Sequence, residues 1–423
     1  MTSDERLYRN SFFDKTRFLH NEFGDELVKR YHICLINEGL HVYSNGIYTP
    51  KLLEQVMIDE LPDINKNQRS EVRAYLRNSS NTPIREPSPP ELIPLKSKVY
   101  DIANDRFLDY SPELVFLNRF PWDYDPAAPK SEAVDKLLMT ITDRGDGKPD
   151  LDVYQLLLQA IGSVLFRQNR YRASFMLYGP SGNNGKSTLL NMITQFIGEQ
   201  NVSYLSLQDT ANRFRGAMIY GKAANIGDDI PDKLLDDSSI YKKLVTGEVV
   251  IAEQKNMDPI PFRSYAKFFF AANSLPPVSD KSRAFFSRIM VIPLKHDFSR
   301  DGDVKLKDRV WTKRDMTYLM KLAIEYGLKG VIQAGHFTAP DAVKLLVNEY
   351  EMENNPVLGW LDEREKRIDG LPTSEVYADF YDWCIKAGHR NVISKKRFSR
   401  ELNVRAGYVT KSSRDGRYYV KEM

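Results

Sequence analysis

Through the middle of this 423-residue chain, the hydrophobic pattern switches repeatedly between that of a strand and that of a helix. Between residue 174 and about residue 294, apolar β-prone runs (SFMLYG, AMIYGKAANIGDD, KFFFAAN and RIMVIPL) alternate with segments of helical periodicity. Buried strands that alternate with helices predict a parallel sheet covered on both faces. The centre of the chain is therefore predicted to be an α/β domain.

The regions on either side of this centre are predicted to combine helices with short hairpins and a linker. Asn45-Gly46 lies between β-prone triplets and predicts a hairpin over 41–49. Residues 79–96 are rich in proline and serine, which is typical of a linker. Gly330 and Pro340 are predicted to break the last long helical region. Further elements are a hairpin over 98–110, helices over about 50–60, 66–78, 131–170 (broken at 143–150) and 312–364, and a helix–helix–hairpin from Thr373 whose turn is Asp415-Gly416.

These elements divide the chain into five predicted parts. They are a small mixed module (1–80), a linker with a short hairpin and the start of a helical domain (81–150), the α/β core with its preceding helix (151–300), a helical segment (301–365) and a carboxy-terminal module (366–423).

Composition excludes several classes of protein. Hydrophobic residues make up 42% and charged residues 28%, as in ordinary globular proteins. No run of eighteen apolar residues predicts a membrane span, and the polar start MTSDERLYRN lacks the features of a signal peptide. The two cysteines are too far apart to indicate a disulfide framework or a zinc site. We therefore expect a cytoplasmic protein, in a bacterial or host-cell cytosol, without a membrane partner.

Charge is distributed unevenly. The net charge is only +3, yet residues 389–423 contain ten basic and three acidic residues. An excess of positive charge in a folded module predicts contact with a polyanion, and DNA is the polyanion that we expect here. The alternative is a solvated basic face on a structural module. The candidate DNA-binding residues of this tail are Lys395, Lys396, Arg397, Arg400, Arg414 and Arg417.

The stretch 174–188, SFMLYGPSGNNGKST, is the most informative of the chain. A glycine-rich loop between a strand and a helix that opens with Lys-Ser-Thr is typical of a P-loop, which binds the phosphates of ATP through its backbone amides. Pro180 stands where the strict pattern has its first glycine, so the loop is one residue longer, and we expect Gly182 and Gly185 to supply the permissive backbone angles. The alternative is a glycine-rich turn without a ligand. The predicted phosphate-binding residues are Gly179, Pro180, Ser181, Gly182, Asn183, Asn184, Gly185, Lys186, Ser187 and Thr188.

Polar residues follow two later apolar runs. Asp228 is predicted to hold Mg²⁺ together with Ser187, and Asp229 to activate or orient the attacking water. Asn273 is predicted to position that water beside the γ-phosphate. The alternatives are an acidic turn or helix cap for the aspartates, and a turn-initiating residue for Asn273. With Lys186, these residues form a candidate catalytic set for ATP hydrolysis.

In this order, the motifs GPSGNNGKST, NIGDD, KKLVTGEVVIAEQKNMDPIPF, KFFFAANSLPP and SRIMVIP resemble those of superfamily 3 helicases, in the phage, plasmid and poxvirus-type primase-helicase branch. The resemblance implies an AAA+ ATPase that forms a hexameric ring and moves 3′ to 5′ on single-stranded DNA. It assigns the arginine finger to Arg288 rather than Arg283. In the third motif it implies a DNA-gripping hairpin with Lys255 at its tip and Lys242 and Lys243 nearby, whereas Asn256 replaces the usual aromatic residue.

The resemblance extends outside the ATPase. Residues 122–170 resemble the helical amino-terminal domain of this branch, 327–363 its post-ATPase helices, and 373–388 its terminal winged-helix module. No zinc-ligand spacing or primase-like region is present, so we expect no primer synthesis by this chain and a separate primase or initiator as a partner.

Three functions remain open from the sequence. A ring-forming replicative helicase of a phage or mobile element, acting on single-stranded and forked DNA, is the first. An origin-recognition protein that uses ATP as an assembly switch is the second. An ATPase that acts on a nucleoprotein or protein, with an incidental basic tail, is the third.

Overall fold

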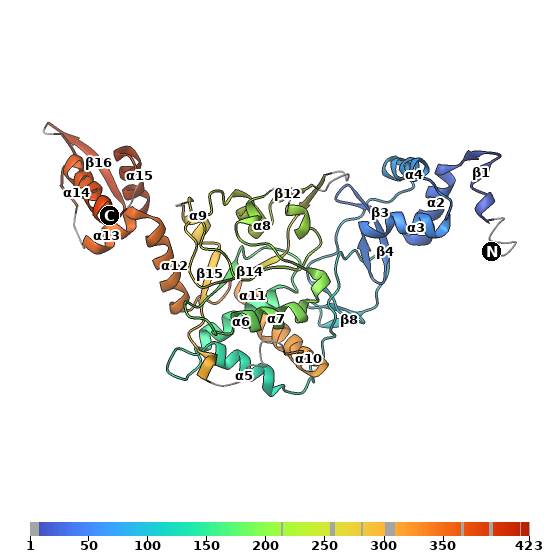
Figure 1. Ribbon diagram of the computed structural model, residues 1–423, viewed down its shortest axis with the longest axis horizontal. Coiled ribbons are helices and arrows are strands. Elements are labelled where there is room, and N and C mark those ends of the chain that lie inside the picture. The colour runs from blue at the N-terminus through green and yellow to red at the C-terminus, as the bar shows by residue number, and fades with distance from the viewer. Residues whose placement is uncertain are drawn as a thin grey trace.

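The computed structural model describes residues 8–212, 215–253, 259–280, 282–300, 309–364, 368–388, 392–414 and 416–422. A central α/β body lies between a smaller amino-terminal module and a carboxy-terminal module (Figure 1). Lys255 and Asp415, which the sequence placed in a DNA-gripping hairpin and a tight turn, lie outside the described residues. None of the described helices combines the length and the apolar character needed to cross a bilayer.

A five-stranded parallel sheet forms the centre, as predicted. Its strands lie in the order β10 (Val202–Ser203), β11 (Ala224–Gly227), β14 (Lys267–Ala272), β9 (Ser174–Tyr178) and β15 (Ile289–Pro293). The two strands that flank β9 in space come from much later in the chain. Because all five strands are parallel, their carboxyl ends meet at one edge and their amino ends at the other.

Alternate side chains of these strands enter two separate cores. Phe175, Leu177 and Phe269 pack on one face, against α5 (Glu132–Ile141), α6 (Leu151–Ser163), α7 (Lys186–Ile197) and α10 (Lys313–Leu322). Met176 and Phe270 pack on the other, against α8 (Ser239–Thr246), α9 (Arg283–Phe286) and part of α12 (Asp341–Asn354). The double coverage explains why these strands are apolar at most positions on both faces.

The amino-terminal module has its own small core. Helices α2 (His20–Tyr31), α3 (Leu53–Glu60) and α4 (Lys66–Asn78) pack against the sheet of β3 (Cys34–Ile36), β4 (Gly39–Ser44) and β5 (Ile47–Thr49). A short ribbon of β1 (Phe13–Asp14) and β2 (Arg17–Phe18) precedes them. Asn45 and Gly46 have φ values of 50° and 85°, as the turn of a two-residue hairpin requires. The predicted hairpin over 41–49 is confirmed.

The predicted linker is wrong in its second half. Leu92–Pro94 forms β6, which pairs with β7 (Val99–Asp101) of the predicted hairpin, and β7 pairs with β8 (Arg106–Leu108). Ile93 and Leu95 are fully buried. Proline-rich composition excluded a helix here, but two well-placed apolar side chains were enough to anchor an extended segment in the core.

The helical region after the sheet departs from the prediction at Gly330. The chain passes from α10 through a π-helical turn (Ala323–Leu328) into α11 (Lys329–Ala334), which contains Gly330 and ends at Gly335 with φ 76°. A Cβ on Gly327 would lie 2.3 Å from the Leu158 carbonyl oxygen, so glycine lets this turn pack directly on α6. The break at Pro340 is confirmed, since it precedes α12.

The carboxy-terminal module follows the predicted order of elements. Helices α13 (Pro356–Arg364), α14 (Thr373–Lys386) and α15 (Lys395–Ala406) enclose a core with the antiparallel pair β16 (Tyr408–Ser413) and β17 (Gly416–Lys421). Phe380 and Phe398 stack at its centre, with ring centroids 4.3 Å apart. The predicted helix–helix–hairpin is confirmed.

Candidate functional site

The carboxyl edge of the central sheet brings three of the predicted segments together. The glycine-rich loop follows β9, Asp228 follows β11, and Asn273 follows β14, which lies between them. The Gly179 amide donates to the Ala272 carbonyl at 3.2 Å, and the Ile230 amide donates to the Ala271 carbonyl at 2.9 Å. These bonds fix the start of the loop and the end of the acidic turn on β14.

The loop accommodates its extra residue at Asn183. Asn183 and Gly185 have φ values of 62° and 79°, whereas Gly182 is not in the left-handed region. The expectation that Gly182 supplies a permissive angle is therefore wrong, and the expectation for Gly185 is right. Asparagine tolerates the left-handed region better than other non-glycine residues, which lets it take this place.

A segment that sequence reasoning missed supports the loop. The Phe298 amide donates to the Asn183 carbonyl at 3.0 Å, and the buried Asn184 donates from Nδ2 to the His296 carbonyl at 2.9 Å. The His296 ring contacts Asp143 at 3.1 Å in the turn between α5 and α6. Nothing in the sequence spacing connects residues 296–298 with the loop, since the contact arises only because β15 lies beside β9.

Lys186 is the cation of this edge. Its Nζ donates to the Gly179 carbonyl at 2.7 Å. Burial lowers the pKa of Lys186, while the charges of Asp228 and Asp229 oppose that shift. The lysine and both carboxylates therefore share one electrostatic environment, in which the ammonium can stabilise negative charge near the loop.

The acidic turn presents two exposed carboxylates. The Asp229 amide donates to Asp228 Oδ1 at 3.0 Å, and Asp229 adopts a left-handed φ of 49°. The described residues contain no group of three or more His, Cys, Asp or Glu side chains that could hold a metal ion. Asp228 and Ser187 are hard oxygen donors at one edge, which suits Mg²⁺ held jointly with phosphate oxygens and water.

Arg288 lies at the opposite edge of the sheet. It directly precedes β15, and its carbonyl accepts hydrogen bonds from the amide and the hydroxyl of Ser174, the first residue of β9. Its guanidinium donates to the Ala284 carbonyl of α9. The five residues of β9 span about 13 Å, so the structure does not bring Arg288 to the glycine-rich loop of its own chain.

The predicted DNA-gripping residues differ in their surroundings. Lys242 forms an ion pair of 2.6 Å with Asp280, which also accepts a hydrogen bond from Ser238. Burial raises the pKa of Asp280, but hydrogen bonds from Lys242, Ser282 and Ser238 hold it far below its usual value. Lys243 is exposed on α8. Within the described residues, Lys243 is thus the better placed of the two for an external ligand.

The basic tail is displayed largely as the sequence suggested. Phe398 and Leu402 of α15 are fully buried. Arg405, which contributes to the positive excess of the tail, is instead paired with Glu351 at 2.5 Å and Glu401 at 3.7 Å and has only 9% of its side chain exposed. The predicted tail residues all have exposed side chains: Lys395, Lys396, Arg397, Arg400, Arg414 and Arg417.

The exposed face of α15 borders the central body. A groove of about 1000 Å³ lies between α15 and α9, and its lining includes Arg283, Lys396, Arg397 and Arg400. Cations of the tail and of the helix that precedes Arg288 therefore face the same space.

Three family models match parts of the chain. They are D5 N terminal like over residues 25–143, a family of unknown function (DUF5906) over 177–288, and Poxvirus D5 protein-like over 352–422. Two viral relatives are named as candidate helicases. They are 121R of Invertebrate iridescent virus 3 (22% identical over 275 residues) and L207/L206 of Acanthamoeba polyphaga mimivirus (21% over 267 residues).

These matches confirm the resemblance to the phage and poxvirus-type branch of superfamily 3 helicases. The aligned region covers 56% of this chain in both cases, but only 29% and 27% of the relatives, so the chain spans less than a third of their length. The 177–288 match to the family of unknown function contains the glycine-rich loop, the acidic turn, Asn273 and Arg288.

Solved structures of the NrS-1 C-terminal region are similar over most of the chain. One apo structure (the A form) covers 92% of this chain and 96% of its own, with 12% identity and a TM-score of 0.49. A second, of residues 305–718, covers 96% and 100%, with 12% identity and a TM-score of 0.47.

Proposed function

We propose that this chain is an ATP-dependent DNA helicase that assembles into a hexameric ring and moves along single-stranded DNA during replication of a virus, phage or mobile element. One observation carries the proposal. The glycine-rich loop, Asp228 and Asn273 lie at one edge of the sheet, and Arg288 lies at the other. A site of this kind is complete only when a second subunit supplies the arginine.

The carboxyl edge would perform the hydrolysis. Backbone amides of the loop and Lys186 would hold the β- and γ-phosphates of ATP, and Ser187 with Asp228 would hold Mg²⁺. Mg²⁺ would neutralise developing charge on the phosphates. Asp229 and Asn273 would orient the attacking water from the two neighbouring strand ends, with Asp229 accepting its proton.

The amino edge would serve the neighbouring subunit. The short helix α9 and the first residue of β15 hold the Arg288 backbone rigidly, since Phe285 and Phe286 are buried beneath it. In a ring, this guanidinium would reach the γ-phosphate of the adjacent subunit and stabilise the transition state. Assembly and turnover would then depend on each other.

DNA would be held electrostatically. Lys243 and Lys255 would contact the strand in the channel, while Lys242 would position α8 through Asp280. The exposed cations of α15 and of the β16–β17 pair would contact the phosphate backbone outside it. The resemblance gives the direction of movement as 3′ to 5′.

The test is unwinding of forked duplexes that carry only a 3′ tail or only a 5′ tail, with ATP hydrolysis measured in parallel and particles imaged with a non-hydrolysable ATP analogue. We expect rings and unwinding from the 3′ tail. ATP-dependent assembly on DNA without unwinding would favour the origin-recognition function. Filter binding without affinity for DNA at any salt concentration would favour an ATPase that acts on protein.

A further inference from the structure

A second cleft lies between the amino-terminal module and the central body, which Figure 1 shows side by side. Its volume is about 930 Å³. One wall comes from β5, α3, α4 and the short 3-10 turn Pro50–Leu52. The other comes from the 3-10 turn Gly216–Ile219 and neighbouring loops of the central body. None of the residues assigned above to ATP or DNA lines this cleft.

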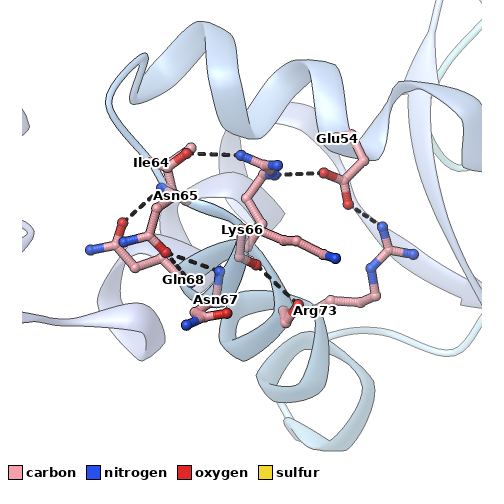
Figure 2. Close-up of polar contacts among 9 residues, drawn as sticks. Glu54, Ile64, Asn65, Lys66, Asn67, Gln68 and Arg73 are labelled. Carbon is pink, nitrogen blue, oxygen red and sulfur yellow. Dashed lines mark hydrogen bonds and ion pairs between the residues drawn. The ribbon is translucent and has the colours of Figure 1, made fainter.

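The charge of the cleft is strongly positive. Glu54 is the one carboxylate among the residues that line it, and its two oxygens are already paired with Arg69, at 2.8 Å, and with Arg73. Figure 2 shows Lys66 extending beside the Glu54–Arg73 pair, with no contact drawn from its ammonium to either. The five lining cations are Lys51, Lys66, Arg69, Arg73 and Lys222.

Two of these lysines, Lys51 and Lys222, come from opposite walls of the cleft. Burial lowers the pKa of Lys222, and the charge of Lys51 on the opposite wall lowers it further. Lys222 is tied to the Gln200 carbonyl, so it cannot move away freely. Like charges held on opposite walls repel, and an anion between them would remove this repulsion.

Lys66 is another lysine whose positive charge lies in an electrostatically unfavourable position. It is the first residue of α4, where the positive end of the helix dipole disfavours a cation. Within the described residues, the side chains of Lys51 and Lys66 have neither a hydrogen bond nor an ion pair. Both side chains are exposed, so their ammonium groups are available to an external anion.

The cleft also has apolar surface beside its cations. Met218 is 50% exposed there, and Ile260 and Tyr220 lie beside it in the lining. The Tyr220 ring is held in place by an edge contact with Phe262, at 5.2 Å between centroids, and by its hydroxyl at 3.0 Å from His41. A ligand that combines negative charge with flat apolar groups fits such walls.

The cleft begins where a predicted DNA-gripping ribbon ends. Ile260 is the first residue of β13 (Ile260–Arg263), which pairs with β12 (Val249–Ala252), and Lys255 belongs to the connection between these two strands. From Lys66 to Arg73, the cations extend over about 10 Å along α4. This spread suits a chain of phosphates better than a single nucleotide.

We propose that the cleft binds single-stranded DNA next to the β12–β13 ribbon, with phosphates between Lys51, Lys66 and Lys222 and bases against Met218 and Tyr220. The proposal rests on the proposed function, because it requires that the chain bind single-stranded DNA. It makes the amino-terminal module part of the DNA path.

The first experiment reverses two exposed charges, in Lys51→Glu/Lys66→Glu. The matched control is Lys29→Glu/Lys136→Glu, which changes two exposed lysines outside the cleft. Affinity for fluorescent oligo-dT is measured at several salt concentrations, with ATP hydrolysis in the absence of DNA. We expect about tenfold weaker binding and a salt slope reduced by about 1.5 in the cleft variant, with unchanged basal hydrolysis. The Lys51→Gln/Lys66→Gln variant should show a smaller loss.

The second experiment uses the cysteines of the chain. Cys34 and Cys384 are both buried, so Met218→Cys introduces one accessible thiol for a photoreactive crosslinker. We expect crosslinks to single-stranded DNA from position 218 and none from Leu345→Cys, which is 61% exposed on α12.

The outcomes separate the two proposals. Tight DNA binding that survives the charge reversal, with no crosslink at position 218, would overturn the cleft site and leave the helicase intact. If the charge reversal weakened only the binding of a fluorescent mononucleotide, the cleft would be a nucleotide site. That result would also overturn the proposed site for single-stranded DNA. A wild-type protein that binds no single-stranded DNA would reject both proposals.

Discussion

The two edges of the central sheet carry polar groups of opposite character. At the carboxyl edge, Asp228, Asp229 and Asn273 are exposed and follow the adjacent strands β11 and β14, next to the strand that leads into the glycine-rich loop. At the amino edge, Lys267 and Asn169 are buried and bonded to each other. Strand β14 begins with the buried Lys267 and is followed directly by the exposed Asn273. Along β14, position and not residue type separates the buried structural lysine from the exposed polar residue at the strand end.

Lys267 shows what the amino edge does. Its Nζ lies 2.7 to 3.1 Å from four oxygens, those of Asn169 Oδ1 and the carbonyls of Phe166, Gln168 and Tyr265. Burial lowers the pKa of Lys267 to about 7. The lysine thus ties the segment that follows α6 and the residues before β14 to the sheet, so its role is structural.

The largest effect should come from the carboxyl edge. Lys186→Ala should reduce ATP hydrolysis by at least about 10³-fold, because charge on the transferring phosphoryl group loses its partner. Steady-state hydrolysis measures this loss. Lys295→Ala, an exposed lysine just after β15, is the matched control and should keep wild-type turnover. Equal activity in both variants would remove Lys186 from the site.

Arg288→Ala should produce the next largest loss, about 10³-fold in turnover with ATP affinity largely intact. The arginine lies at the edge away from its own loop, so its role requires a second subunit. Arg283→Ala, on the same short helix, is the control.

Mixing the Arg288→Ala and Asp229→Ala proteins tests the shared site directly. In mixed rings some interfaces combine both defects, whereas others join the intact Asp229 of an Arg288→Ala subunit to the intact Arg288 of an Asp229→Ala subunit, so hydrolysis recovers at the intact interfaces. Failure of recovery in rings shown to be mixed, or full activity of Arg288→Ala alone, would contradict an arginine supplied by the neighbour.

The sequence predicted the carboxyl edge well and the amino edge poorly, for a physical reason. Gly179, Asp228 and Asn273 each follow an apolar, β-prone run, so these three strand ends could be located from the sequence. Lys267 was hidden in an apolar run, because its four partners come from positions 166, 168, 169 and 265 and meet it only in the folded sheet. The support of the loop by Phe298 was missed for the same reason.

Contacts that form only in the folded chain also explain the smaller errors of the sequence-based prediction. The break predicted at Gly330 and the linker over 79–96 both relied on local propensity. Packing overrode it in each case, through the close approach of Gly327 to α6 and the burial of Ile93 and Leu95. The pairing of Arg405 with Glu351 was likewise invisible, since these residues are far apart in the sequence.

Lys267→Met should leave the carboxyl edge unchanged and destabilise the fold. Four oxygens lose their donor, so we expect the free energy of unfolding to fall by about 2–3 kcal/mol at pH 7, measured by chemical denaturation. Lys136→Met, at an exposed position of α5, should change it by less than about 0.5 kcal/mol.

The pH dependence of Lys267→Met has a definite sign. The folded pKa is about 7 and the unfolded value is 10.5, so between these values the unfolded state binds more protons. Stability contributed by this group therefore rises with pH across that window. The difference between wild type and Lys267→Met should grow from pH 7 to pH 9, and a difference that shrinks would contradict the buried lysine.

The smallest contrast lies within the loop, between Gly185→Ala and Gly182→Ala. Gly185 has φ 79°, and a Cβ there would lie 2.7 Å from the Phe298 ring, whereas a Cβ on Gly182 would meet no described atom within 4 Å. Gly185→Ala should lower the free energy of unfolding by about 1–2 kcal/mol and reduce ATP binding, measured with a fluorescent analogue. Gly182→Ala should leave both nearly unchanged. If Gly182→Ala were the more damaging substitution, Gly182, and not Asn183, would supply the second left-handed position, and the way this loop accommodates its extra residue would have to be redrawn.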